Sequence, residues 1–120
     1  MAWLLVAIFG ALGAISRYLL DRAIMGRLAS DFPVGTLVIN LSGALILGIV
    51  VGLATRNILS TEDTIAIGDG FIGAYTTFST LTFESLTLAN ADSISLGILN
   101  MVGTVVAATI LAYLGLHIVE

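Results

Sequence analysis

The stretch of sequence that decides the fold is GFIGAYTTFSTL, residues 70–81. It lies within an apolar run, residues 64–89, and a helix needs about 20 apolar residues to cross a bilayer. Glycine and β-branched threonine are poor helix formers, and serine and threonine hydroxyls compete for backbone hydrogen bonds. We therefore expect the helix to break between Gly73 and Ser79. Irregular backbone at membrane depth is tolerated only where it lines a site or is buried in protein, so the break marks a candidate site.

The composition is that of a membrane protein. Of 120 residues, 58% are hydrophobic and 10% are charged, against roughly 45–50% and about 25% in soluble domains. Mean hydropathy is +1.12. One small core cannot bury so much apolar surface, so the excess faces lipid. This excludes a soluble enzyme, a nucleic-acid binder and a disordered segment, and we expect no enzymatic activity. The absence of cysteine and the single histidine, His117, exclude disulfides, thiol catalysis and a Cys/His metal centre.

Four apolar segments predict an all-α, multi-pass membrane protein with a single domain, residues 1–120. The predicted spans are residues 3–20, 34–54, 64–89 and 94–116, joined by short polar connections. Four spans place both termini on one side of the membrane. The arginine counts of the connections on the two sides differ by one residue, which is a weak orientation signal. A single orientation and insertion both ways up therefore both remain open.

Local signals mark helix ends and helix contacts. Pro33 is placed to start the second span, and Ser60 with Asp63 resembles a capping box before the third. Gly48 and Gly52 form a G-x-x-x-G pair, which allows two helix backbones to approach closely.

Polar side chains inside the predicted spans are the informative residues. Asn40 lies in the middle of the second span and needs hydrogen-bond partners there. Asn100 and Thr104 are four residues apart on the last span and share one helix face. Each alone can serve as a helix–helix contact, but together with the polar third span they favour a polar track. Asp69 and Glu84 bracket the polar stretch of that span about 22 Å apart, so both can reach the interfaces and neither needs to be a buried proton carrier.

Three blocks of sequence resemble the motifs of a known family. GALGAISRY (residues 10–18) resembles GGxxGAxxRY, GTLVINLSG (35–43) resembles GTLxVNxxG, and GFIGAYTTFST (70–80) resembles GxxGGxTTFST. These motifs belong to the Fluc (CrcB-type) fluoride channel family, and the blocks lie on three of the four predicted spans in the family's order. The resemblance implies a fluoride-selective channel in the cytoplasmic (inner) membrane that exports fluoride passively and reduces its toxicity. It also implies an antiparallel, dual-topology dimer with two pores, formed with a second copy or with a homologous chain.

The resemblance also implies which residues bind ions. By position, the residues that line the fluoride pathway are Arg17, Thr36, Asn40, Phe78, Glu84, Asn100 and Thr104. Thr36 and Glu84 lie nearer its mouth, and Asn100 and Thr104 are a looser match to the family. Ser79 and Thr80 add hydroxyl groups. Fluoride only accepts hydrogen bonds, so amide, hydroxyl and ring-edge C–H groups can replace its water, and neutral donors allow release. Arg17, near the end of its span, can attract anions without trapping them. A structural sodium ion at the dimer centre is implied as well, held by the backbone carbonyls of Gly73 and Thr76.

Two positions depart from the family's pattern. Ala74 stands where the family usually has a second glycine, and Leu81 stands where it usually has a second pore phenylalanine. Phe83 is not an obvious replacement, because two residues along a helix rotate a side chain by about 200°. Three readings of Leu81 are open: it is tolerated, it weakens conduction, or a homologous partner chain supplies the missing ring.

Two other functions compete with a fluoride channel. The first is a small dual-topology multidrug or guanidinium exporter, which also has four spans but needs a carboxylate in mid-membrane to bind a proton and a cation in turn. The second is a non-conducting membrane subunit that needs a homologous partner and uses its polar residues as helix–helix contacts.

Overall fold

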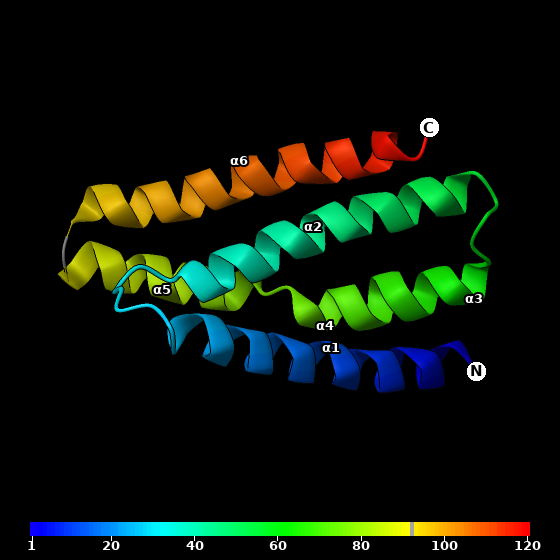
Figure 1. Ribbon diagram of the computed structural model, residues 1–120, viewed down its shortest axis with the longest axis horizontal. Helices are drawn as coiled ribbons and strands as arrows, with labels where there is room; N and C mark the ends of the chain where they lie inside the picture. The colour runs from blue at the N-terminus through cyan, green and yellow to red at the C-terminus, as the bar shows by residue number, and fades with distance from the viewer. Residues whose placement is uncertain (92) are drawn as a thin grey trace.

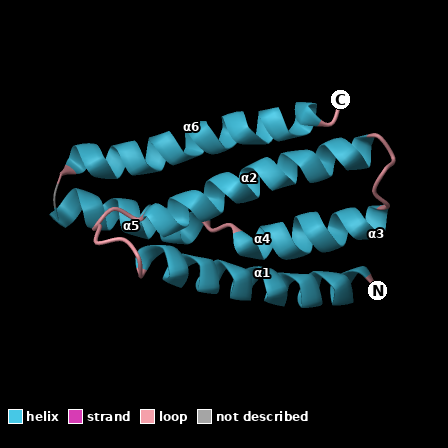
Figure 2. Cartoon of the chain, viewed as in Figure 1, coloured by secondary structure: helices cyan, strands magenta, loops and turns pink. Residues whose placement is uncertain are grey.

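The computed structural model describes residues 1–91 and 93–120, so Asp92, within the predicted connection 90–93, lies outside the described residues. The described chain contains helices and loops and no strand, as expected for an all-α protein (Figure 2). The helices run along the long axis of a body that measures 47 × 28 × 22 Å (Figure 1). Both termini lie at the same end of this axis, as an even number of passes requires.

Three helices are long and apolar enough to cross a membrane: α1 (Ala2–Met25), α2 (Val34–Thr55) and α6 (Ile94–Ile118). They cover three of the four predicted spans, and the largest difference is at α1, which continues to Met25 where the sequence predicts an end at residue 20. Large apolar side chains point away from the protein on these helices, among them Trp3 (74% exposed) and Ile98 (57% exposed). Lipid is the environment that covers such a surface in a membrane protein.

The third apolar segment is divided into two halves, and this is the main feature of the fold. Its pieces are α3 (Thr61–Thr64), the π-helix η1 (Ile65–Ile72), α4 (Gly73–Tyr75) and, after an interruption, α5 (Phe78–Ala91). Thr76 takes an extended conformation, with φ −81° and ψ 157°. The break therefore lies at Thr76 and Thr77, inside the predicted interval, and a loop separates α4 from α5 at this point (Figure 2).

The start of this segment follows the predicted local chemistry. Ser60 Oγ accepts a hydrogen bond from the Asp63 backbone N–H at 3.1 Å, and the Asp63 carboxylate accepts one from the Ser60 backbone N–H at 3.4 Å. This reciprocal capping box confirms the predicted helix start. The wider π-helical turns of η1 follow directly, and the sequence analysis does not predict them.

Glycines bring the helix backbones into contact. A Cβ added at Gly48 would meet the backbone carbonyl oxygen of Ala112, and one added at Gly115 would meet the carbonyl oxygen of Leu45. At Gly52 the added atom would meet α6 as well, so the predicted close approach at the G-x-x-x-G pair is confirmed. A glycine also allows α1 to pack closely against η1, since a Cβ added at Gly13 would meet the backbone carbonyl oxygen of Phe71.

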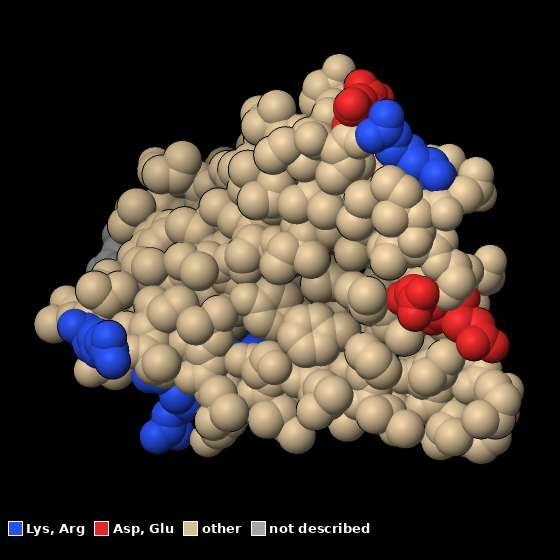
Figure 3. All heavy atoms as spheres, turned by 45° about the vertical axis from the view of Figure 1, so that its right-hand side comes forward, with Lys and Arg blue, Asp and Glu red and all other residues tan. Residues whose placement is uncertain are grey.

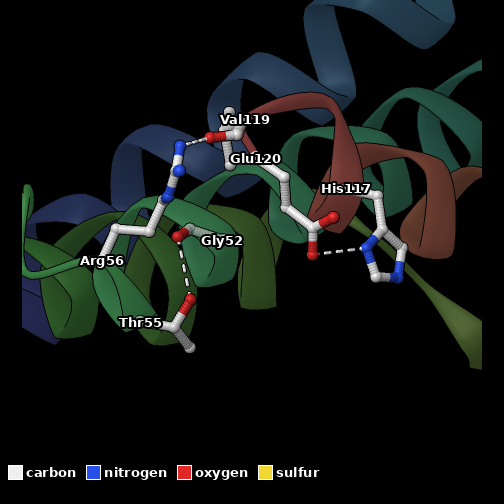
Figure 4. Close-up of polar contacts among 6 residues, drawn as sticks. All are labelled: Gly52, Thr55, Arg56, His117, Val119 and Glu120. Carbon is white, nitrogen blue, oxygen red and sulfur yellow. Dashed lines mark hydrogen bonds and ion pairs between the residues drawn. The ribbon is translucent and has the colours of Figure 1, made fainter.

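Polar contacts hold the ends of α2 and α6 together. Arg56 at the end of α2 donates a hydrogen bond to the backbone carbonyl of Val119 at the end of α6, and His117 Nδ1 lies 2.7 Å from Glu120 Oε1 (Figure 4). Most charged side chains lie toward the edges of the face shown, and the surface between them is uncharged except for a small patch of arginine atoms (Figure 3). This distribution suits a protein whose middle lies in hydrocarbon.

We expect Gly48→Ala to destabilise the protein by about 1–3 kcal/mol, because the new methyl group forces the α2 and α6 backbones apart. Gly103→Ala is the matched control, since its Cβ would meet only Leu99 Cδ1 at 3.8 Å and alanine favours a helix over glycine. The measurement is the midpoint of thermal unfolding of the purified protein in detergent. Equal midpoints for the two variants would contradict the tight α2–α6 contact.

Candidate functional site

A side chain from α2 holds the break in the third segment. Asn40 Nδ2 donates a hydrogen bond to the Thr77 carbonyl at 3.0 Å, and Asn40 Oδ1 accepts one from the Thr77 backbone N–H at 2.8 Å. The amide group is both donor and acceptor, so it can replace the two backbone partners that Thr77 lacks where the helix stops. Asn40 is buried, and these bonds supply the partners that the sequence predicts it to need.

Thr77 also caps the helix that follows. Its Oγ1 accepts a hydrogen bond from the Thr80 backbone N–H at 3.3 Å and bonds the Thr80 hydroxyl at 3.1 Å. The Ser79 hydroxyl lies 3.3 Å from the same oxygen. Thr77 thus occupies the N-cap position of α5, a role that threonine favours. The sequence predicts Thr77 as a hydroxyl donor for fluoride but does not predict its N-cap role; a threonine directly before the restart of a helical pattern is the signal that could have found it.

The break releases two backbone carbonyls. In a continuous helix the N–H groups of Thr77 and Thr80 would bond to the carbonyls of Gly73 and Thr76. Here these N–H groups bond to Asn40 and to the Thr77 hydroxyl instead. Within residues 1–91 and 93–120 no hydrogen bond is donated to either carbonyl oxygen. Gly73 is also exposed, and a Cβ added there would meet only the Gly68 carbonyl oxygen, at 3.7 Å. The unpaired carbonyl of Gly73 therefore belongs to an exposed residue, carbonyl oxygens are suitable ligands for sodium, and the role of Gly73 and Thr76 as sodium ligands stays a prediction.

The first of three cavities lies beside the break. It has a volume of about 380 Å³, and its polar lining includes Asn40, Thr77 and Thr104. Thr104 is 3% exposed, and its hydroxyl has no hydrogen-bond partner among the described residues. Phe78 and Leu81 also line this cavity, so the structure brings together three of the predicted pathway residues, Asn40, Phe78 and Thr104.

A second, smaller cavity of about 180 Å³ lies on the other side of Thr77. It is lined by Arg17, Tyr18, Asp21, Thr36, Ile39, Thr77 and Thr80. Arg17 Nε is buried and has no hydrogen-bond partner in the described part of the chain. Arg17 lies eight residues before the end of α1, farther from the helix end than the sequence suggests. In this position it lines the second cavity. Three more predicted residues, Arg17, Thr36 and Thr80, thus share one polar cavity.

A hydrogen bond joins the second cavity to a third. Thr36 Oγ1 donates to Glu84 Oε1 at 2.9 Å, and Glu84 also lines a cavity of about 560 Å³ with Asp21, Asp31 and Phe83. Thr36 thus offers the Glu84 carboxylate a donor inside the protein, while Glu84 borders the third cavity together with Asp21 and Asp31. The other carboxylate oxygen of Glu84 is buried without a partner among the described residues. Phe83 faces this third cavity and not the first, as its spacing from Leu81 predicts.

Asn100 lies apart from the three cavities. Its Nδ2 donates a hydrogen bond to Ser85 Oγ at 2.9 Å, and both residues are buried between α5 and α6. None of the three cavities is lined by Asn100. The pairing resembles a helix–helix contact, and the placement of Asn100 on the pathway stays a prediction.

These features define an all-helical membrane protein in which cavities with amide, hydroxyl and charged side chains in their linings lie beside a broken helix. The family described as CrcB-like protein, Camphor Resistance (CrcB), matches residues 4–116, and the chain belongs to this family.

Among its relatives, "Fluoride-specific ion channel FluC 2" of Moorella thermoacetica is 40% identical over 115 residues, which are 96% of this chain and 93% of that protein. "Fluoride-specific ion channel FluC" of Magnetococcus marinus is 41% identical over 119 residues, 97% of this chain and 94% of that protein. The protein of the same name from Shewanella halifaxensis is 39% identical over 116 residues, 97% of this chain and 94% of that protein.

We expect Asn40→Ala to destabilise the protein by about 2–4 kcal/mol, because it leaves the N–H and C=O of Thr77 unpaired in a buried place. Ser42→Ala is a control on the same helix, since it removes the contact between Ser42 and the Tyr75 hydroxyl but leaves the break intact. Thermal unfolding in detergent compares the two. A smaller loss for Asn40→Ala than for Ser42→Ala would contradict the role of Asn40 at the break.

Proposed function

We propose that this protein is a fluoride-selective channel that lets fluoride leave the cytoplasm passively. The observation that carries the proposal is the pair of cavities on either side of Thr77, with Asn40 and Thr104 in the lining of one and Thr36 and Thr80 in the lining of the other. The names of relatives about 40% identical over nearly the full chain support fluoride as the ion.

The chemistry of the first cavity suits a small anion that only accepts hydrogen bonds. Asn40 uses one Nδ2 hydrogen on Thr77, so the second is free to face the cavity. The unpartnered hydroxyl of Thr104 is another donor, and the ring edge of Phe78 presents C–H groups with partial positive charge. Among the described residues, none with a full positive charge lines this cavity, which permits release of the anion, as conduction requires.

The second cavity has a different role in this mechanism. The positive charge of Arg17 attracts an anion, and the hydroxyls of Thr36 and Thr80 take over part of its hydration. Asp21 lines the same cavity and offsets the charge of Arg17, which prevents the cavity from holding the anion too tightly. Anions therefore pass from a charged entrance to a neutral constriction.

The direction of flow follows from the membrane potential. With the cell interior negative, fluoride is driven outward by about 2.3 kcal/mol per 100 mV. A passive channel of this kind in the cytoplasmic membrane lowers the fluoride concentration of the cell and so reduces its toxicity. The two halves of the third segment, residues 61–75 and 78–91, together cross the membrane once, so that with α1, α2 and α6 the chain crosses it four times.

The functional unit in this proposal is a dimer of two copies in antiparallel orientation. The weak arginine bias allows insertion both ways up, and the exposed Gly73 with its unpaired carbonyl needs a polar partner within the membrane. The carbonyls of Gly73 and Thr76 from both copies would hold a sodium ion at the centre of this dimer. A bound sodium ion supplies positive charge that balances the carbonyl dipoles of the two broken helices.

The test is fluoride efflux from liposomes that contain the purified protein alone, read with a fluoride electrode beside a chloride control. We expect fast fluoride release and negligible chloride release. Asn40→Ala should lose at least 90% of the fluoride rate, because the amide donor and the break geometry are both lost. Ser42→Ala is the control on the same helix, and we expect it to retain most of the rate, since it leaves the Asn40–Thr77 contact in place.

No fluoride release from a well-assembled wild-type dimer would overturn the proposal. Proton-driven uptake of a cationic dye by the same liposomes would instead support an exporter of cations. Flux that appears only with a homologous chain would assign this protein to a heterodimer.

Leu81→Phe tests the missing phenylalanine. Leu81 is 3% exposed and lines the first cavity beside Phe78, so a larger ring has about 380 Å³ of cavity beside it. We expect fluoride efflux to rise several-fold, because a second ring edge faces the anion. Leu47→Phe, which adds the same ring to the α2 wall of the same cavity, is the control. An equal rise in both variants would show that ring position is unimportant.

A further inference from the structure

Asp69 is a carboxylate on the open face of η1. It is exposed, although it lies within the apolar segment 64–89, near the start of that segment. Its neighbours Gly68 and Gly70 are buried, one against Leu47 of α2 and the other against Phe9 of α1. The side of η1 that carries Asp69 is therefore the side turned away from α1 and α2. Within the described residues Asp69 takes part in no hydrogen bond and no ion pair.

The same open face carries the released carbonyl of Gly73. Asp69 and Gly73 are four residues apart, which is about one helical turn, and both are exposed. The Gly73 carbonyl, which has no donor, follows Asp69 on this face, and the second carbonyl without a donor, that of Thr76, follows at the break. One unpaired carboxylate and two unpaired carbonyls thus lie within eight residues of one another, between Asp69 and the break.

This combination of atoms points to a cation. Carboxylate and carbonyl oxygens are the ligands that hard cations prefer. A carboxylate within a membrane segment is costly unless it meets a counter-charge or water, and here the counter-charge is not supplied by the described chain. A cation near the carbonyls would relieve both the charge of Asp69 and the unpaired oxygens.

We propose that Asp69 strengthens cation binding at the Gly73 and Thr76 carbonyls, acting as a positioning charge one helical turn away. This inference rests on the proposed dimer, in which the open faces of two copies enclose the cation. Asp69 does not ligate the ion directly; its negative charge raises the affinity for a monovalent cation such as Na⁺. A single charge at this range in partly buried surroundings changes affinity by about tenfold, or about 1.4 kcal/mol.

The experiment measures the sodium affinity of the assembled full-length dimer in detergent. The thermal unfolding midpoint is followed while sodium chloride replaces N-methyl-D-glucamine chloride at constant ionic strength, so that screening does not change. Wild type is compared with Asp69→Asn, with Asp69→Glu, which keeps the charge, and with Glu62→Gln, which removes an exposed charge at the start of the same segment. If Asp69→Asn does not assemble, Asp69→Thr takes its place.

We expect Asp69→Asn to need about tenfold more sodium for half of the stabilisation, and the other two variants to stay within twofold of wild type. An unchanged sodium requirement in Asp69→Asn would overturn the inference while leaving the cation site intact. If no sodium concentration stabilises the wild-type protein, both the inference on Asp69 and the cation site itself are overturned. Fluoride efflux from liposomes, measured on the same preparations, shows separately whether the proposed channel function stands.

Discussion

The structure depends on one constraint: backbone polar groups inside a membrane must find partners within the protein. A helix satisfies this constraint by itself, and a broken helix does not. The side-chain amide of Asn40 bonds the N–H and C=O groups of Thr77, and the hydroxyl oxygen of Thr77 accepts a hydrogen bond from the N–H of Thr80. The result is a stable interruption that still leaves the carbonyls of Gly73 and Thr76 available. The same two side chains therefore hold the break and shape the cavities on either side of it.

Small residues make this arrangement possible. Because glycines on α2 and α6 allow their backbones to touch, α2 is fixed firmly enough to present Asn40 at a defined depth. Close packing of α1 against η1 has a similar effect on the other side, where Gly13 lies against the carbonyl of Phe71. Rigid contacts of this kind position polar groups more precisely than a loosely packed bundle would.

Much of the fold and part of the site could be predicted from the sequence. The helix-breaking residues locate the break, apolar length gives the three long helices, and the spacing of Phe83 from Leu81 places it away from the first cavity. The partner of Asn40 could not be predicted, because it is a backbone group 37 residues away and any residue presents such a group. The inward turn of Glu84 depends in the same way on Thr36, which lies on another helix. The π-helix η1 has no clear local signal.

The contact between Asn40 and Thr77 has an unequal consequence for the evolution of the gene. Position 40 must supply a side-chain donor and acceptor together, which asparagine does at the required length. Position 77 contributes only main-chain atoms to this contact, so the contact itself places no restriction on its codon. The restriction on position 77 comes from the N-cap of α5, which serine, aspartate or asparagine can also form. Variation should therefore be permitted at position 77 where it is forbidden at position 40, even though the two residues form a single contact.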